Sequence, residues 1–210
     1  MNRLCLGTFI GVMMAARSLS ADVLFTEPHG SLLPGLVDTY NFQYVGIAFT
    51  LNQGAQIQDV TVQMGNDGYP DTFFAALCVL DPTTHLPHGN PFQSGDILYS
   101  ELFTAPSSSI ATFTIPFAVT VPAGQYGLIF GGNSFGANVR SGYSATYQAQ
   151  PGISMTVWNP SGGWFYDGYS TLDVTIDGMV VPEPTPVFLL GLGCLAFILF
   201  RLKGGRPIGA

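Results

Sequence analysis

The sequence predicts an all-β protein built as a single β-sandwich or jelly-roll domain, and three observations carry this prediction. Apolar and polar residues alternate over several stretches, which is the period of a strand with one buried face. Turn-forming residues separate these stretches. The chain has 210 residues, 47% of them hydrophobic, which is enough apolar material for one core. We expect the domain to span residues 22–178.

Strands are expected where β-branched and aromatic residues gather, at 42–51, 60–64, 72–80, 113–121, 125–130, 154–158 and 172–176. Gly, Pro, Asn and Asp mark turns between them at 66–68, 81–82, 88–91, 122–124, 159–160 and 167–168. Pro116 interrupts the clearest alternation, 113–121. Because proline cannot donate a ladder hydrogen bond, we expect that strand at a sheet edge or bulged.

The N-terminal segment, residues 1–21, predicts a signal peptide that forms a helix. Arg3 begins it, an apolar stretch follows from residue 4 to residue 16, and small residues lie at 18–21. Cleavage after Ser20 or Ala21 fits this order. An uncleaved membrane anchor is the alternative, which the shortness of the apolar run disfavours.

Another apolar segment, at 187–200, lies near the end of the chain and is followed by Arg201, Lys203 and Arg206. It is shorter than the ~20 residues of a comfortable membrane span. We expect a transmembrane helix at 186–202, with the basic tail 201–206 as a stop-transfer signal on the cytoplasmic side. A buried core helix is the alternative, disfavoured because the cations follow the run directly.

Val181, Pro182, Glu183 and Pro184 stand immediately before this apolar run. The two prolines favour an extended segment outside the helix. Residues 179–210 resemble the PEP-CTERM sorting signal of exported bacterial proteins. The resemblance implies a membrane-embedded exosortase as partner, cleavage near the motif, and transfer to the cell surface or extracellular matrix. The membrane is then a partner only until processing.

The charge of the predicted domain excludes one class of partner. Between residues 22 and 178 there are twelve Asp and Glu and one cation, Arg140, for which we expect an acidic partner. Nucleic-acid binding rests on Lys and Arg that neutralise phosphates, so no nucleic-acid partner is expected. Of the three cysteines, Cys78 alone lies in the predicted domain, where we expect it to be buried.

Oxygen-bearing side chains gather at Asn66, Asp67 and Asp71, with Asp81 expected nearby across the sheet. Hard cations such as calcium prefer these ligands, so a structural calcium is one interpretation of the cluster. A plain hairpin turn at Asn-Asp-Gly is the other. No other cofactor is expected. His85 and His88 flank Pro87, which predicts solvated loop histidines rather than a zinc site.

Aromatic residues crowd one glycine-rich stretch, which includes Trp158, Trp164, Tyr166 and Tyr169. Such a stretch suits a loop that stacks on sugar rings or on another protein. Core or corner packing is the alternative, because aromatic area is normally buried.

The segment 45–176 is similar to the choice-of-anchor domains of exported bacterial proteins, particularly the R type. The similarity rests on residues 46–50 and 57–62, a Pro87-His88-Gly89 turn before 97–98, and residues 121–126. These domains are named for occurring with alternative surface anchors. The resemblance implies no established activity.

Catalytic motifs are absent from the sequence, which has no nucleophile elbow, no His-Glu-x-x-His and no phosphate-binding glycine loop. Acid pairs such as Asp96 and Glu101 arise by chance among so many carboxylates. We therefore expect no enzyme and no catalytic residues. The interpretation is an exported surface or matrix protein with a structural or adhesive role linked to exopolysaccharide. A hydrolase acting on polysaccharide and a carbohydrate-binding module are the alternatives.

Overall fold

A computed structural model describes residues 22–27, 29–38, 43–66, 71–105, 110–140, 142–149, 155–168 and 170–181, with the backbone alone for 29–38, 66 and 143. The predicted signal peptide, the motif residues Pro182, Glu183 and Pro184, the helix 186–202 and its basic tail lie outside these ranges. None of the described residues belongs to a helix long and apolar enough to cross a membrane.

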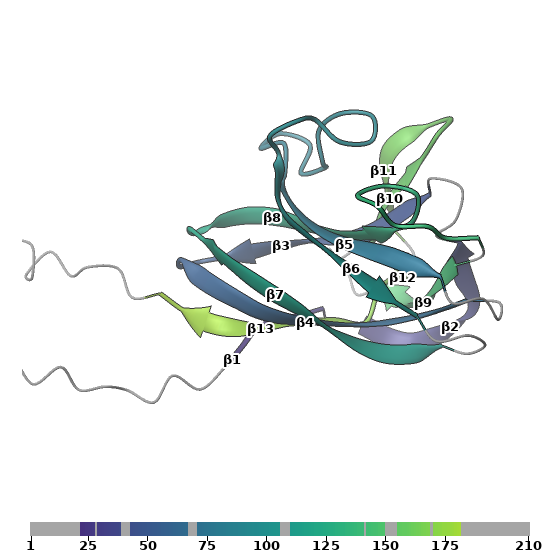
Figure 1. Cartoon of the computed structure of the whole chain (residues 1–210), viewed down its shortest axis with the longest axis horizontal. Helices are drawn as coiled ribbons and strands as arrows, with labels where there is room; N and C mark the ends of the chain where they lie inside the picture. Colours follow the sequence, from purple (N-terminus) through teal and green to yellow (C-terminus); the bar gives the residue numbers. More distant parts are fainter. Residues whose placement is uncertain are drawn as a thin grey trace, which may run out of the picture.

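The described residues form two antiparallel sheets, which confirms the all-β prediction and is consistent with a β-sandwich (Figure 1). Sheet A follows the order β1 (Asp22–Thr26), β13 (Val174–Val180), β4 (Ala55–Asn66), β9 (Gly142–Ala149) and β12 (Ser170–Thr171). In the same sheet, β2 (His29–Asp38) pairs with β9, and β7 (Ala111–Val121) pairs with β4. Sheet B follows the order β11 (Gly163–Asp167), β10 (Met155–Asn159), β3 (Tyr44–Leu51), β8 (Gly124–Gly131), β5 (Thr72–Val79) and β6 (Ile97–Thr104).

The main core lies between the two sheets and is built from the alternating residues that the sequence shows. Inward side chains of sheet A include those of Val60, Val62, Met64, Ile115, Phe117, Val174 and Ile176. They meet inward side chains of sheet B that include Val45, Ile47, Phe73, Leu77, Leu128 and Phe130. Each of these residues is at most 1% exposed, so the predicted alternation is confirmed in these strands.

A second apolar cluster covers the outer face of sheet B. Its buried members are Tyr44, Phe74, Ala76, Cys78, Leu80, Ile129, Ala137 and Trp158. Strands β3, β5 and β8 are therefore buried on both faces over much of their length, which is why they read as nearly continuous apolar runs. Cys78 is buried as expected, and burial raises the pKa of its thiol to about 12.

The strand that contains Pro116 lies at an edge of sheet A. Among the described strands, β7 pairs with β4 alone, and Pro116 lies opposite Asp59. The register between these two strands shifts between Ile57 and Asp59. The expectation of an edge or bulged strand is therefore confirmed, because both features occur together.

The first and last described strands are neighbours. Asp22 of β1 lies opposite Gly178 of β13, and Val180 lies opposite Ala55. The backbone N–H of Val181 donates to the carbonyl oxygen of Gly54 at 2.7 Å. The described domain thus begins and ends at the same end of the sandwich (Figure 1).

We expect Gly46→Ala to destabilise the fold, because an added Cβ would clash with the carbonyl oxygen of Leu128 and the side chain of Ile129. The loss should be about 1–3 kcal/mol in free energy of unfolding, measured by urea denaturation. Gly54→Ala is the matched control, since its nearest atom would be 3.4 Å away. Equal stabilities of the two variants would contradict close packing of β3 on β8.

Candidate functional site

The longest connection within sheet B, residues 80–96 between β5 and β6, folds back over the outer face of that sheet (Figure 1). Its base is closed by a hydrogen bond from the Val79 N–H to the Asp96 carbonyl at 2.9 Å. A bridge between Leu80 and Pro87 tightens its first half. Long ordered loops held on a rigid sheet often carry function, so this connection is the candidate site.

Asp81 organises the first turn of this connection. Its Oδ1 accepts hydrogen bonds from the backbone N–H of Thr83 at 2.8 Å and from that of Thr84 at 2.7 Å. The Thr84 hydroxyl donates to the same oxygen at 3.2 Å. These bonds, led by the one from the Thr84 N–H, lower the pKa of Asp81 to about 2. The carboxylate is therefore ionised throughout the physiological range.

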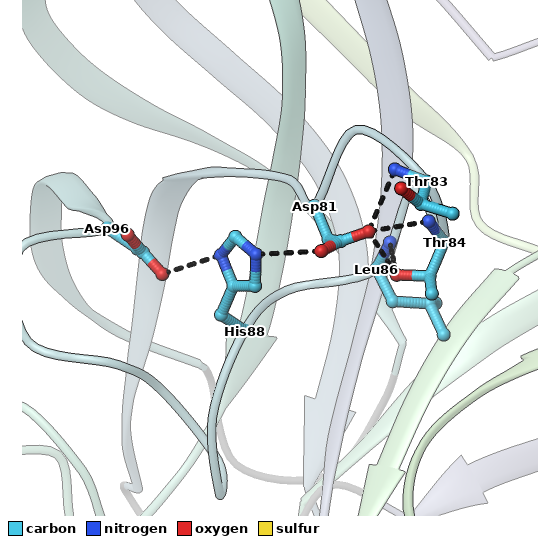
Figure 2. Close-up of polar contacts among 6 residues, drawn as sticks. All are labelled: Asp81, Thr83, Thr84, Leu86, His88 and Asp96. Carbon is cyan, nitrogen blue, oxygen red and sulfur yellow. Dashed lines mark hydrogen bonds and ion pairs between the residues drawn. The ribbon is translucent and has the colours of Figure 1, made fainter.

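The imidazole of His88 lies between two carboxylates, as Figure 2 shows. Its Nε2 is 3.0 Å from Asp81 Oδ2, and its Nδ1 is 2.9 Å from Asp96 Oδ2. Hydrogen bonds to Asp81 and Asp96 raise the pKa of His88, because both partners stabilise the protonated ring. We call Asp81, His88 and Asp96 the loop clasp, since they join the two ends of the connection.

The loop clasp can bind and release a proton at the imidazole of His88. Both ring nitrogens of His88 already face carboxylates, so the imidazole cannot also ligate a metal or take a proton from a nucleophile without breaking a clasp bond. No group of three or more His, Cys, Asp or Glu among the described residues is arranged to hold a metal ion. Glu101, which the sequence pairs with Asp96, instead accepts the Tyr99 hydroxyl at 2.9 Å.

The hairpin β10–β11 also contacts the 80–96 connection. The indole N–H of Trp164 donates to the Pro91 carbonyl at 2.6 Å. The Tyr166 hydroxyl lies 2.7 Å from the His85 carbonyl oxygen and 3.2 Å from that of Thr84. The connection is therefore held through its backbone by two aromatic side chains of β11.

The structure corrects the predicted aromatic platform at Trp158 alone, whereas Tyr166 is 41% exposed and a glycan contact there stays a prediction. Trp158 is 4% exposed and stacks on Tyr44, with ring centroids 5.1 Å apart, so core packing describes it. The polar atoms of Trp164 and Tyr166 are used in holding the connection. Tyr169 lies outside the described residues. Trp164 and Tyr166 thus fix the connection, whereas Trp158 lies opposite Trp164 in the ladder and packs in the cluster on the outer face of sheet B.

The predicted calcium ligands are not all described. Asp67 lies outside the described residues, and of Asn66 only the backbone is placed. Asp71 is buried, and its Oδ2 accepts the backbone N–H of Arg140 at 2.9 Å. Asp81 lies beyond the opposite end of β5 from Asp71, so the expectation that it joins this cluster is wrong.

The loop clasp could have been suspected from the sequence only in part. The Pro-His-Gly turn points to a loop histidine, and acids stand seven residues before it and eight after it. The sequence does not show that the path of the connection brings all three together.

Comparisons with known proteins give no family for this chain. No protein-family model matches it, and no curated protein matches it. A solved structure of infectious bursal disease virus, Gt strain, aligns with 80% of this chain and 41% of its own at 10% sequence identity, with a TM-score of 0.24. The chain therefore spans less than half the length of that protein, and a likeness this weak carries no argument.

The loop clasp predicts a pH-dependent contribution to stability. Folding raises the pKa of His88, so the protonated imidazole stabilises the folded state. This contribution should be complete below the unfolded pKa of about 6.5, and it should fade as pH rises through the folded pKa. The loss of melting temperature in His88→Gln should then be larger at about pH 5.5 than at about pH 9. Thermal denaturation at both pH values measures this.

His85→Gln is the control for that measurement, because the ring of His85 meets the uncharged Oε1 of Gln125 at 2.7 Å. A His88→Gln deficit that stays constant or grows towards alkaline pH would contradict the charged clasp.

Tyr166→Phe should loosen the connection without unfolding the sandwich, because it removes the hydroxyl that contacts two loop carbonyls. We expect faster amide hydrogen exchange in residues 82–93, by a factor of about ten for a local loss of ~1.5 kcal/mol. Exchange in β3 and β8 should be unchanged. Equal protection of the connection in both proteins would show that the hydroxyl contacts add nothing.

Proposed function

We propose that the chain is an exported protein that an exosortase processes and that serves a structural or adhesive role at the cell surface or in the extracellular matrix, linked to exopolysaccharide. Support comes first from the order of segments in the sequence. An apolar N-terminal run precedes an acidic domain, and Val181–Pro184, a second apolar run and three cations follow it.

The observation that carries the proposal is the pairing of the first described strand with the last. Asp22 lies opposite Gly178, so the ends that adjoin the two terminal segments leave the sandwich together. A domain tethered through one end keeps its faces and its far end available for contacts. This arrangement suits a protein first held at a membrane and later released to a surface.

The outer face of sheet A supports an adhesive role. Thr114 of β7, Thr61 of β4, Thr175 of β13 and Thr26 of β1 lie opposite one another across four strands. The hydroxyls of Thr61 and Thr114 are 3.2 Å apart. Such a row offers hydroxyl donors and acceptors to a polyhydroxylated polymer.

Binding is favoured over hydrolysis by the way the candidate site is built. The two carboxylates of the loop clasp both face His88, whereas a glycosidase needs two carboxyl groups on either side of a substrate. Activity on a panel of glycans would reveal a hydrolase. Retention on a glycan without turnover would describe a binding module or an adhesive protein.

The test of the proposal is the fate of the full chain in an exporting host that has an exosortase. We expect material outside the cell whose intact mass fits a start at residue 21 or 22 and an end near 181–184. The variant Glu183→Ala should accumulate in the membrane fraction. Unprocessed wild-type chain in the soluble cytosol would contradict export and sorting together.

A further inference from the structure

Phe135 is presented to solvent by the connection between β8 and β9, although its backbone conformation is unfavourable. The side chain is 39% exposed, and its φ is 54°. A bulky residue rarely adopts this left-handed region, which glycine normally occupies. Such strain persists where the surrounding structure over-determines it, and it concentrates at functional sites.

The surrounding structure fixes this connection closely. Asn133, also at positive φ, accepts the Val139 N–H at 3.4 Å and donates to the Val139 carbonyl at 3.5 Å. The hydroxyls of Ser134 and Tyr44 are 2.6 Å apart. Two backbone hydrogen bonds join Asn138 to Thr72. Phe135 is therefore held in place before any ligand arrives, which lowers the entropic cost of binding.

Phe135 belongs to a continuous apolar surface on the outer face of sheet B. Its ring contacts Phe74, with centroids 4.9 Å apart, and Phe92, with centroids 5.4 Å apart. Leu102, which is 43% exposed, lies opposite Phe74 in the ladder and beside Gly136. We call Phe92, Leu102 and Phe135 the Phe135 patch.

Polar, uncharged side chains lie near the Phe135 patch, and we call Ser100, Thr104 and Asn138 its polar rim. Ser100 and Thr104 lie on the same exposed face of β6 as Leu102, and Asn138 is exposed three residues after Phe135. An aromatic ring bordered by hydroxyl and amide groups matches a sugar, whose ring has an apolar face and a hydroxyl-bearing edge. Anionic polymers suit this surface poorly, because residues 22–178 hold twelve acids and one Arg.

We infer that the Phe135 patch binds a neutral polysaccharide, with a sugar ring stacked on Phe135 and its hydroxyls directed to the polar rim. The inference rests on the proposed adhesive function and deepens it by assigning a contact site and a ligand class. The patch differs from the predicted stretch of Trp158, Trp164 and Tyr166, in which Trp158 is buried and the other two side chains hydrogen-bond to the 80–96 connection.

Affinity electrophoresis and pull-down of the purified protein test the site, with a soluble β-glucan and amorphous cellulose as neutral probes and alginate as the anionic probe. We expect the wild type to bind a neutral probe more strongly than alginate. Phe135→Ala should weaken that binding by roughly tenfold or more, whereas Phe135→Tyr, which keeps the ring, should retain it.

Phe165→Ala is the matched control, because Phe165 is 40% exposed and lies on β11, outside the patch. Thermal denaturation of each variant separates lost binding from lost folding. Equal binding by Phe135→Ala and wild type, an equal loss in Phe165→Ala, or stronger binding of alginate would overturn the inference. So would wild-type self-association that Phe135→Ala abolishes while no neutral probe is bound.

Export and binding are separate readouts. A protein that stays in the cytosol yet binds a β-glucan through Phe135 would refute the proposed function and leave the site intact. A protein that is exported and processed but binds no neutral probe would refute the site and leave the proposed function standing.

Discussion

Burial of both faces of sheet B is the constraint on which the rest of the structure depends. One face packs against sheet A, and the other carries Tyr44, Phe74, Ile129 and further apolar side chains that would otherwise meet water. Uncovered, that outer face would be a large exposed apolar surface. The chain covers it with its own connections, which explains why the β5–β6 connection is long and why the β10–β11 hairpin, at the edge of sheet B, hydrogen-bonds to that connection.

The polar features of the molecule follow from that covering role. A loop that lies on an apolar face needs fixed ends and fixed backbone groups, because buried peptide groups must find hydrogen-bond partners. The Asp81–His88–Asp96 contacts fix the ends, and Trp164 and Tyr166 satisfy loop carbonyls. The same packing presents Phe135 at the border of the covered region. The connections that cover the outer face of sheet B and the Phe135 patch are therefore neighbours on that face.

Prediction from the sequence succeeded where periodicity and burial coincide. The segment 113–121 alternates strictly and forms β7, and Pro116 correctly indicated an edge. The strands β1, β2, β6, β9 and β11 were not predicted. Most of them lack a clean alternation, but β6 alternates strictly between half-buried and exposed residues and was missed all the same. Among the described aromatics, Trp158 was offered as a surface contact and is buried, since composition does not show which face of a strand is covered.

The sequence by itself determined the strands with a clear alternation or an apolar run, the acidic and nearly cation-free character of the domain, and the expectation of sorting segments at both termini, because these depend on local pattern and composition. Only the tertiary structure decided that Asp22 pairs with Gly178, that His88 lies between two acids, and that Phe135 is exposed while Trp158 is not. The physical reason is that these contacts join residues far apart in the sequence, and the local pattern around each residue does not indicate its partner. Strand register and the path of each connection bring them together, and these are settled when the two faces of sheet B are buried.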